Sequence, residues 1–127
     1  MNIMIEVSLG ELVDKISILR LKKLNIKDPT KVNSASKEES ILYESLKSLK
    51  LENIENHLEK LQKINAKLWK IEDDIRLKEK AKAFDDEFIK LARSVYVVND
   101  ERFKAKDDVN QAYGSNIVEV KSYEDYS

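Results

Sequence analysis

The chain has 127 residues, with 23 Lys and Arg against 24 Asp and Glu. This length predicts one domain over residues 1–127, and the net charge of −1 argues against a basic nucleic-acid clamp or a polybasic membrane binder. The apolar fraction of 42% is too high for a disordered chain, while the 37% of charged residues interrupts any membrane span. The absence of cysteine excludes a disulfide framework and a thiolate metal site.

The N-terminus lacks the basic segment of a signal peptide, and Glu6 interrupts its short apolar run, so we expect a cytoplasmic protein. Residues 3–7 are rich in β-branched and apolar types and predict a short strand or an extended lead-in. Ser8 and Glu11 then fit a capping box and predict a helix over about 9–25.

The first predicted helix is apolar on two faces. One face has Leu9, Leu12, Val13, Ile16 and Leu19, and the other has Ile18 and Leu21. A helix of this kind lies at the centre of a bundle or is shared with a second subunit.

Three further helices are predicted over about 29–50, 52–81 and 85–112. Pro29 favours the first position of its helix, and Gly114 favours a helix stop. The pattern predicts an all-α protein, a four-helix and mostly up-down bundle. Because a small bundle gains buried surface by association, we expect a homo-oligomer, with a homodimer preferred.

The C-terminal segment 117–120 again has strand character. A pairing of residues 4–7 with residues 117–120 is left open, because an isolated two-stranded pair is marginal unless it packs on helices.

Polar side chains interrupt the apolar stripes of the third and fourth predicted helices. Spacings of four, three and four residues place Asn65, Trp69, Glu72 and Arg76 on one helical ridge. On the fourth helix, Asn99, Arg102 and Lys106 fall in line with Val95.

Two interpretations of these polar positions stay open. In the first, Glu72 and Arg102 form a buried ion pair that fixes helix register or partner choice, with Asn65 or Asn99 completing its hydrogen bonds. In the second, the polar side chains line a cavity, which Lys15 joins, for a small anionic or sugar-like ligand. The predicted ligand-binding residues are Asn65, Trp69, Glu72, Arg76, Asn99 and Arg102.

Three sequence strings are distinctive: LWKIEDDIR at 68–76, LARSVY at 91–96 and VKSYEDY at 120–126. With them, the chain resembles a family of short helical bacterial and phage proteins that is catalogued as a domain of unknown function. The resemblance implies a compact helical protein and brings no known reaction or ligand. Its strings overlap the polar positions found from helical spacing.

Carboxylates are the only plausible metal ligands in this chain. Glu11 and Asp14, together with Glu72 and Asp73, offer hard oxygen ligands for Mg²⁺ in a nucleotide phosphohydrolase. The order of the acidic pairs differs from that of the MazG-type pyrophosphohydrolases, and a solvated acidic surface is the competing interpretation. We therefore predict no catalytic residues, no metal and no cofactor.

The leading hypothesis is a non-enzymatic binding or interaction module that acts as a homo-oligomer. The alternatives are a protein that binds a small anionic ligand, such as a nucleotide or sugar phosphate, and the Mg-dependent phosphohydrolase. Lys residues alternate with Glu at helical spacing, which predicts an ion-paired surface rather than a nucleic-acid stripe. We expect neither a nucleic-acid nor a membrane partner.

Overall fold

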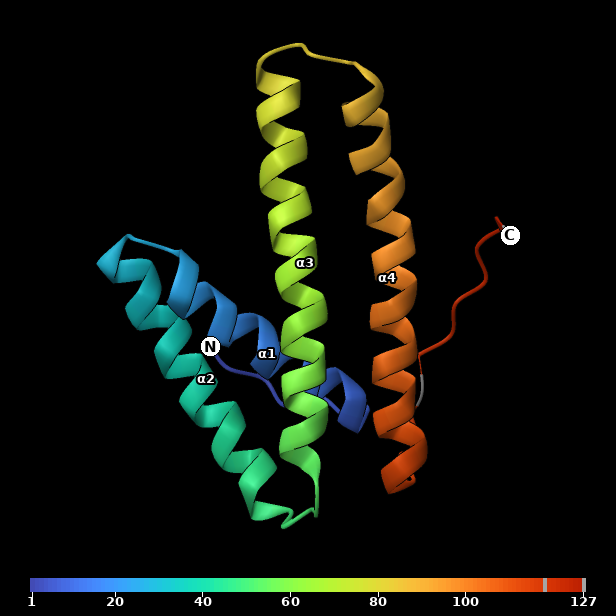
Figure 1. Ribbon diagram of the computed structural model, residues 1–127. Coiled ribbons are helices and arrows are strands. Elements are labelled where there is room, and N and C mark those ends of the chain that lie inside the picture. Colours follow the sequence, from blue (N-terminus) through green and yellow to red (C-terminus); the bar gives the residue numbers. More distant parts are fainter. Residues whose placement is uncertain (118, 127) are drawn as a thin grey trace.

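A computed structural model describes residues 1–117 and 119–126. It confirms an all-α, four-helix bundle (Figure 1). The helices are α1 (Leu9–Asn25), α2 (Pro29–Ser48), α3 (Ile54–Lys80) and α4 (Asp86–Tyr113). In the described part of the chain, none of these helices combines the length and the apolar character needed to cross a membrane.

Local signals account for most helix ends. The Ser8 side chain accepts a hydrogen bond from the Glu11 backbone N–H, as the predicted N-cap requires. Asp28 and Asp85 cap α2 and α4 in the same way. Gly114 ends α4 in the left-handed conformation, with φ of 67°, which glycine adopts without steric cost.

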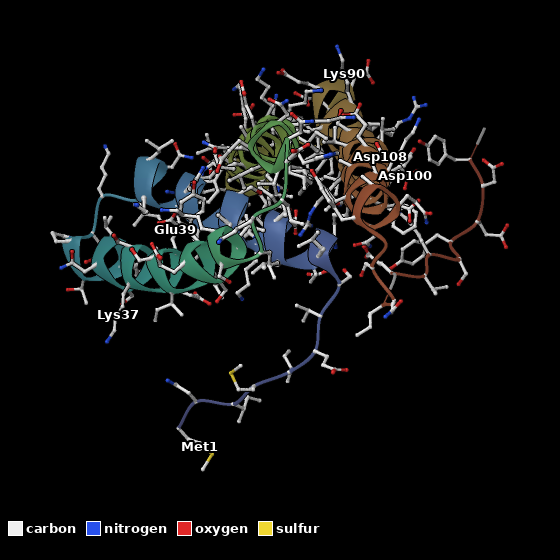
Figure 2. The ribbon with its side chains drawn as sticks, turned by 90° about the horizontal axis from the view of Figure 1, so that it is seen from below. Met1, Lys37, Glu39, Lys90, Asp100 and Asp108 are labelled. Atoms are coloured by element: carbon white, nitrogen blue, oxygen red, sulfur yellow. The ribbon has the colours of Figure 1, made fainter. Side chains whose placement is uncertain are left out.

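The segment that precedes α1 is extended, and residues 1–7 are exposed to solvent. Figure 2 shows it leading away from the four helices, with Met1 at its far end. Neither residues 1–117 nor residues 119–126 contain a strand. The pairing of 4–7 with 117–120 is therefore not found, and Val118 of that predicted strand lies outside the described residues.

Helix α1 is the centre of the fold. It packs against α2, α3 and α4, and Figure 1 shows it passing across one half of the α3–α4 hairpin. This position explains its two apolar faces, because one helix must contact neighbours on several sides. Val13 and Ile16 are fully buried there, in one core cluster with Leu58, Leu61 and Val109.

The other half of the α3–α4 hairpin projects beyond α1 and α2 (Figure 1). We call residues 66–97 the arm. The last buried residue of α3 is Asn65 and the first of α4 is Val98, so no residue of the arm is buried. Each apolar side chain of the arm is therefore at least partly exposed to solvent.

The first turn of α1 lies directly on the backbone of α4. The Gly10 backbone N–H donates to Asn110 Oδ1 at 2.7 Å. A Cβ atom at Gly10 would lie 2.4 Å from the Lys106 carbonyl oxygen, which is closer than any normal contact. The missing side chain thus permits the close crossing of α1 and α4.

We predict that Gly10→Ala destabilises the protein by about 1–3 kcal/mol, because the added methyl group forces the two helix backbones apart. Alanine has a higher helix propensity than glycine, so without the close crossing the substitution would raise the free energy of unfolding. The sign of the measured change therefore distinguishes the two effects. Urea unfolding followed by circular dichroism measures it. A stabilised Gly10→Ala variant would contradict the close crossing.

Candidate functional site

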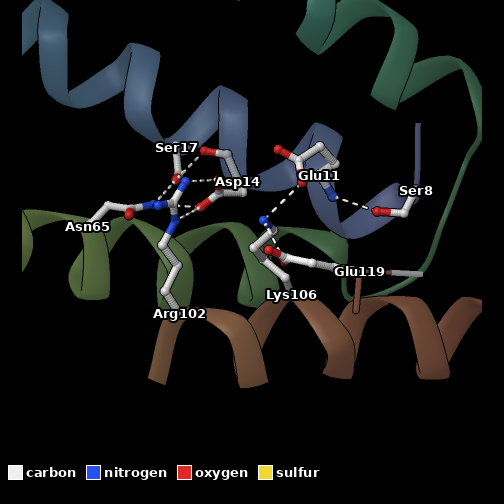
Figure 3. A network of polar contacts seen from close by, with 8 residues as sticks. All are labelled: Ser8, Glu11, Asp14, Ser17, Asn65, Arg102, Lys106 and Glu119. Carbon is white, nitrogen blue, oxygen red and sulfur yellow. Dashed lines mark hydrogen bonds and ion pairs between the residues drawn. The ribbon is translucent and has the colours of Figure 1, made fainter. Parts of the chain in front are cut away.

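A buried carboxylate lies where α1, α3 and α4 meet (Figure 3). Asp14 of α1 is 1% exposed. Arg102 of α4 donates from Nε to Asp14 Oδ1 at 3.0 Å and from Nη2 to Oδ2 at 2.6 Å. Asn65 of α3 donates from Nδ2 to Asp14 Oδ1 at 2.9 Å and to Ser17 Oγ at 2.8 Å. We call these four residues the Asp14 network.

The geometry of the network satisfies the buried charge. A bidentate guanidinium–carboxylate pair gives two charge-assisted hydrogen bonds in a fixed plane. The hydrogen bond to Asp14 raises the pKa of Arg102, and burial, which lowers it, is the smaller effect. Throughout the described residues, every buried side-chain nitrogen and oxygen has a hydrogen-bond partner. The network is therefore complete rather than strained.

The predicted ion pair between Glu72 and Arg102 is wrong. Glu72 pairs instead with Arg76 on its own helix, at 3.0 Å, and both side chains are at least half exposed. Arg102 pairs with Asp14 because α1 passes across the α3–α4 hairpin at this level and supplies a buried carboxylate. Lys15 also lies outside the network, since it pairs with Glu38 of α2.

The spacing of the acidic residues indicates Asp14 only as a candidate metal ligand. A usable signal was present, because Asp14 precedes Ile18 and Leu21 by four and seven residues and thus shares their apolar face. A carboxylate on an apolar face requires a buried cation. Arg102, already identified in an apolar stripe, was the matching partner.

A second ion-paired group lies beside the network (Figure 3). Lys106 of α4 is buried, and its Nζ lies 2.9 Å from Glu11 Oε2 on α1 and 2.8 Å from Glu119 Oε2 after α4. Burial lowers the pKa of Lys106, but its hydrogen bonds to Glu119 and Glu11 outweigh burial, and the pKa lies above its ordinary value. Lys106 is therefore a buried ammonium group.

A cleft opens between α1 and the base of the arm, and we call it the elbow cleft. Its polar and aromatic lining includes all six predicted ligand-binding residues: Asn65, Trp69, Glu72, Arg76, Asn99 and Arg102. Ile18, Leu21, Leu68 and Asp73 complete the lining. Its volume of about 470 Å³ falls in the range of small-molecule sites. That these six residues bind a ligand stays a prediction.

The elbow cleft combines a fixed base with free polar groups. Asn65 and Arg102 are held by Asp14, whereas Trp69 and Asn99 make no side-chain hydrogen bond with the described residues. Among the described residues, the exposed Arg76 forms its ion pair with Glu72 at the rim. The cleft thus offers an indole N–H, an amide and a guanidinium group to an incoming molecule.

The carboxylates of the phosphohydrolase hypothesis are divided between two places. Glu11 and Asp14 are paired with Lys106 and Arg102, and Glu72 and Asp73 line the elbow cleft. Within residues 1–117 and 119–126, no group of three or more His, Cys, Asp or Glu residues is arranged to hold a metal ion.

Comparison with known proteins gives one match. Residues 3–126 fit the model described as "Family of unknown function (DUF6165)". The chain belongs to this family. The resemblance to a helical family of unknown function is thereby confirmed over nearly the whole chain. No curated protein and no solved structure matches the chain.

We predict that Arg102→Met destabilises the protein by about 3 kcal/mol, because it leaves the buried Asp14 carboxylate without its cation. Glu72→Gln, in contrast, changes the free energy of unfolding by less than about 0.5 kcal/mol, since its pair is on the surface. Urea unfolding of both variants measures the difference. Equal losses in the two variants would contradict the assignment of Arg102 to Asp14.

Proposed function

We propose that this protein is a non-catalytic, cytoplasmic binding module that acts as a homodimer, with the elbow cleft and the adjoining arm as its interface. The observation that carries the proposal is the convergence of the six predicted polar and aromatic residues on one open cleft, at the base of an arm that has no buried residue. Interfaces are enriched in Trp, Tyr and Arg, which agrees with this lining.

The arm supports association because two helices cannot cover each other's apolar residues. Its exposed apolar side chains include Leu77, Phe84, Ile89, Tyr96 and Val97. Two arms packed face to face form a four-helix bundle, in which each helix has neighbours on two sides. Such a bundle gives the arm the core that a single chain lacks.

The net charge of the chain and the mixed charges on the arm favour a second copy of this chain as the partner at the elbow cleft and the arm. The net charge of −1 leaves little repulsion between copies, and the arm carries both signs, as in the Lys70–Asp74 and Arg76–Glu72 pairs. A two-fold interface places the same surface on both copies, so a surface of mixed sign can match itself. The Asp14 network holds Asn65 and Arg102 rigidly at the base of this surface.

We predict a light-scattering mass of two chains for the wild type and of one chain for Trp69→Glu, because a carboxylate in the cleft opposes burial of the interface. Ile41→Glu is the matched control, since Ile41 is an exposed apolar residue of α2, outside the arm and the cleft. It should keep the mass of two chains. A wild-type mass of one chain at high protein concentration would rule out the homodimer.

We propose a small anionic ligand, a nucleotide or sugar phosphate, as the second candidate occupant. The specific observation is that Arg76, Trp69 and the amide of Asn99 line the same cleft. A guanidinium group binds phosphate oxygens in a bidentate manner, and an indole gives a flat apolar wall to a base or sugar ring.

A thermal-shift panel of nucleotides and sugar phosphates tests this candidate. A ligand at 100 times its dissociation constant stabilises the fold by about 2.7 kcal/mol. We predict that Arg76→Gln removes the shift, whereas Arg93→Gln, a change to an exposed arginine outside the elbow cleft, retains it. No shift with the wild type, or equal shifts with both variants, would reject a ligand bound through Arg76. Trp69 is the only tryptophan, so its fluorescence reports occupation of the cleft directly.

A further inference from the structure

The segment after α4 runs alongside that helix (Figure 1), and two ion pairs join it to α4. We call residues 119–126 the tail. Glu119 pairs with Lys106, and Lys121 pairs with Asp100 of α4. The Tyr126 ring lies 5.1 Å from the Tyr96 ring between centroids.

Apolar burial contributes little to holding the tail. Val120 and Tyr123 are each 85% exposed, and the core cluster and its packed neighbours come from residues 9–113. Displacing the tail therefore exposes little additional apolar surface. The tail can leave α4 without disturbing the core.

Glu119 is one of two carboxylates that pair with the buried ammonium group of Lys106, and it is the one that can move away. The Lys106 side chain is 7% exposed and is shared between two carboxylates (Figure 3). Glu11 is fixed in the first turn of α1, whereas Glu119 belongs to the tail. Without Glu119, the ammonium group keeps one carboxylate and loses the other.

A cleft lies between α4 and the tail, and we call it the tail cleft. It has a volume of about 610 Å³. On α4 it is lined by Tyr96, Asn99, Asp100, Arg102, Phe103 and Lys106. Arg102 and Asn99 line both this cleft and the elbow cleft, so the two clefts adjoin at these two side chains.

We propose that Lys106 anchors a binding site for an oxyanion, the carboxylate or phosphate group of a small molecule, and that Glu119 fills this site from within the chain. The number of charges at the site is the same whether Glu119 or an incoming singly charged oxyanion contacts Lys106. Lys106 and Arg102 face Glu11, Asp14 and Glu119, and an incoming monoanion that replaces Glu119 leaves two cations against three anions. The fold already accepts an anionic oxygen 2.8 Å from Lys106 Nζ.

Binding at this site displaces the tail from α4. In the released tail, Lys121 no longer pairs with Asp100, so the peptide bond after Lys121 becomes accessible to a protease. The surface of α4 around Phe103 also becomes accessible. Lys106 and Glu119 do not line the elbow cleft, so this proposal rests on contacts other than those that support the homodimer.

The decisive experiment compares two full-length variants that each remove one negative charge from the tail, Glu119→Gln and Glu124→Gln. Glu119 pairs with Lys106, whereas Glu124 is not among the residues that line the tail cleft and lies at a smaller hollow of about 230 Å³ further along the tail. Inorganic phosphate and succinate are the probes, titrated in thermal-shift assays at ionic strength held constant with potassium chloride.

We expect Glu119→Gln to bind at least one probe at least tenfold more tightly than Glu124→Gln, because its internal competitor is gone and the open site is fully populated. Adding Lys106→Met to Glu119→Gln should abolish the response. A thermal shift with phosphate alone would indicate that the site binds a phosphate group, and a shift with succinate alone would indicate a carboxylate. Equal responses of Glu119→Gln and Glu124→Gln, or no response to either probe, would overturn the proposal.

A second readout uses the wild type and does not depend on any variant folding. Trypsin cleavage after Lys121, followed by mass spectrometry, should accelerate severalfold when the bound probe displaces the tail. An unchanged cleavage rate at saturating probe would contradict displacement of Glu119, even if the probe binds elsewhere.

Discussion

One buried carboxylate organises this small bundle. Asp14 is 1% exposed, and a charge at that depth is tolerated only with a cation and further hydrogen bonds. Arg102 and Asn65 supply them from α4 and α3, so the contacts of one side chain join three helices (Figure 3). Arg102 also lines the elbow cleft, and the Lys106 bridge begins one helical turn further along α4. Both candidate binding sites therefore depend on the same fixed centre.

Helix boundaries and caps could be predicted from the sequence because their causes are local. Ser8 caps α1, Pro29 begins α2 and Gly114 ends α4, and each acts through its nearest neighbours in the chain. The polar positions Asn65 and Arg102 were also found, because helical spacing identifies a polar residue in an apolar stripe. Their partner was missed, since the spacing within a helix does not specify how helices cross. The close crossing of α1 over α4 instead depends on Gly10.

Side chains at the base of α3 and α4 are fixed by hydrogen bonds, whereas those along the arm are more exposed. At the base, Asn65 and Arg102 are locked by the Asp14 network, while along the arm no residue is buried and Arg76 is paired only on the surface. The fixed side chains at the base lower the ordering cost of association, whereas the mobile side chains of the arm lose conformational freedom when they bind. Arg102 and Asn99 line both clefts. A molecule bound in the tail cleft would therefore contact side chains that also shape the elbow cleft.

A double-mutant cycle tests the central role of Asp14 most directly. The free energies of unfolding of Asp14→Asn, Arg102→Met and the double variant give the coupling between the two side chains, and the same cycle with Glu72→Gln gives the reference. The account predicts a coupling of about 2 kcal/mol or more for Asp14 with Arg102, and less than about 0.5 kcal/mol for Glu72 with Arg102. A larger coupling for Glu72 than for Asp14 would contradict it.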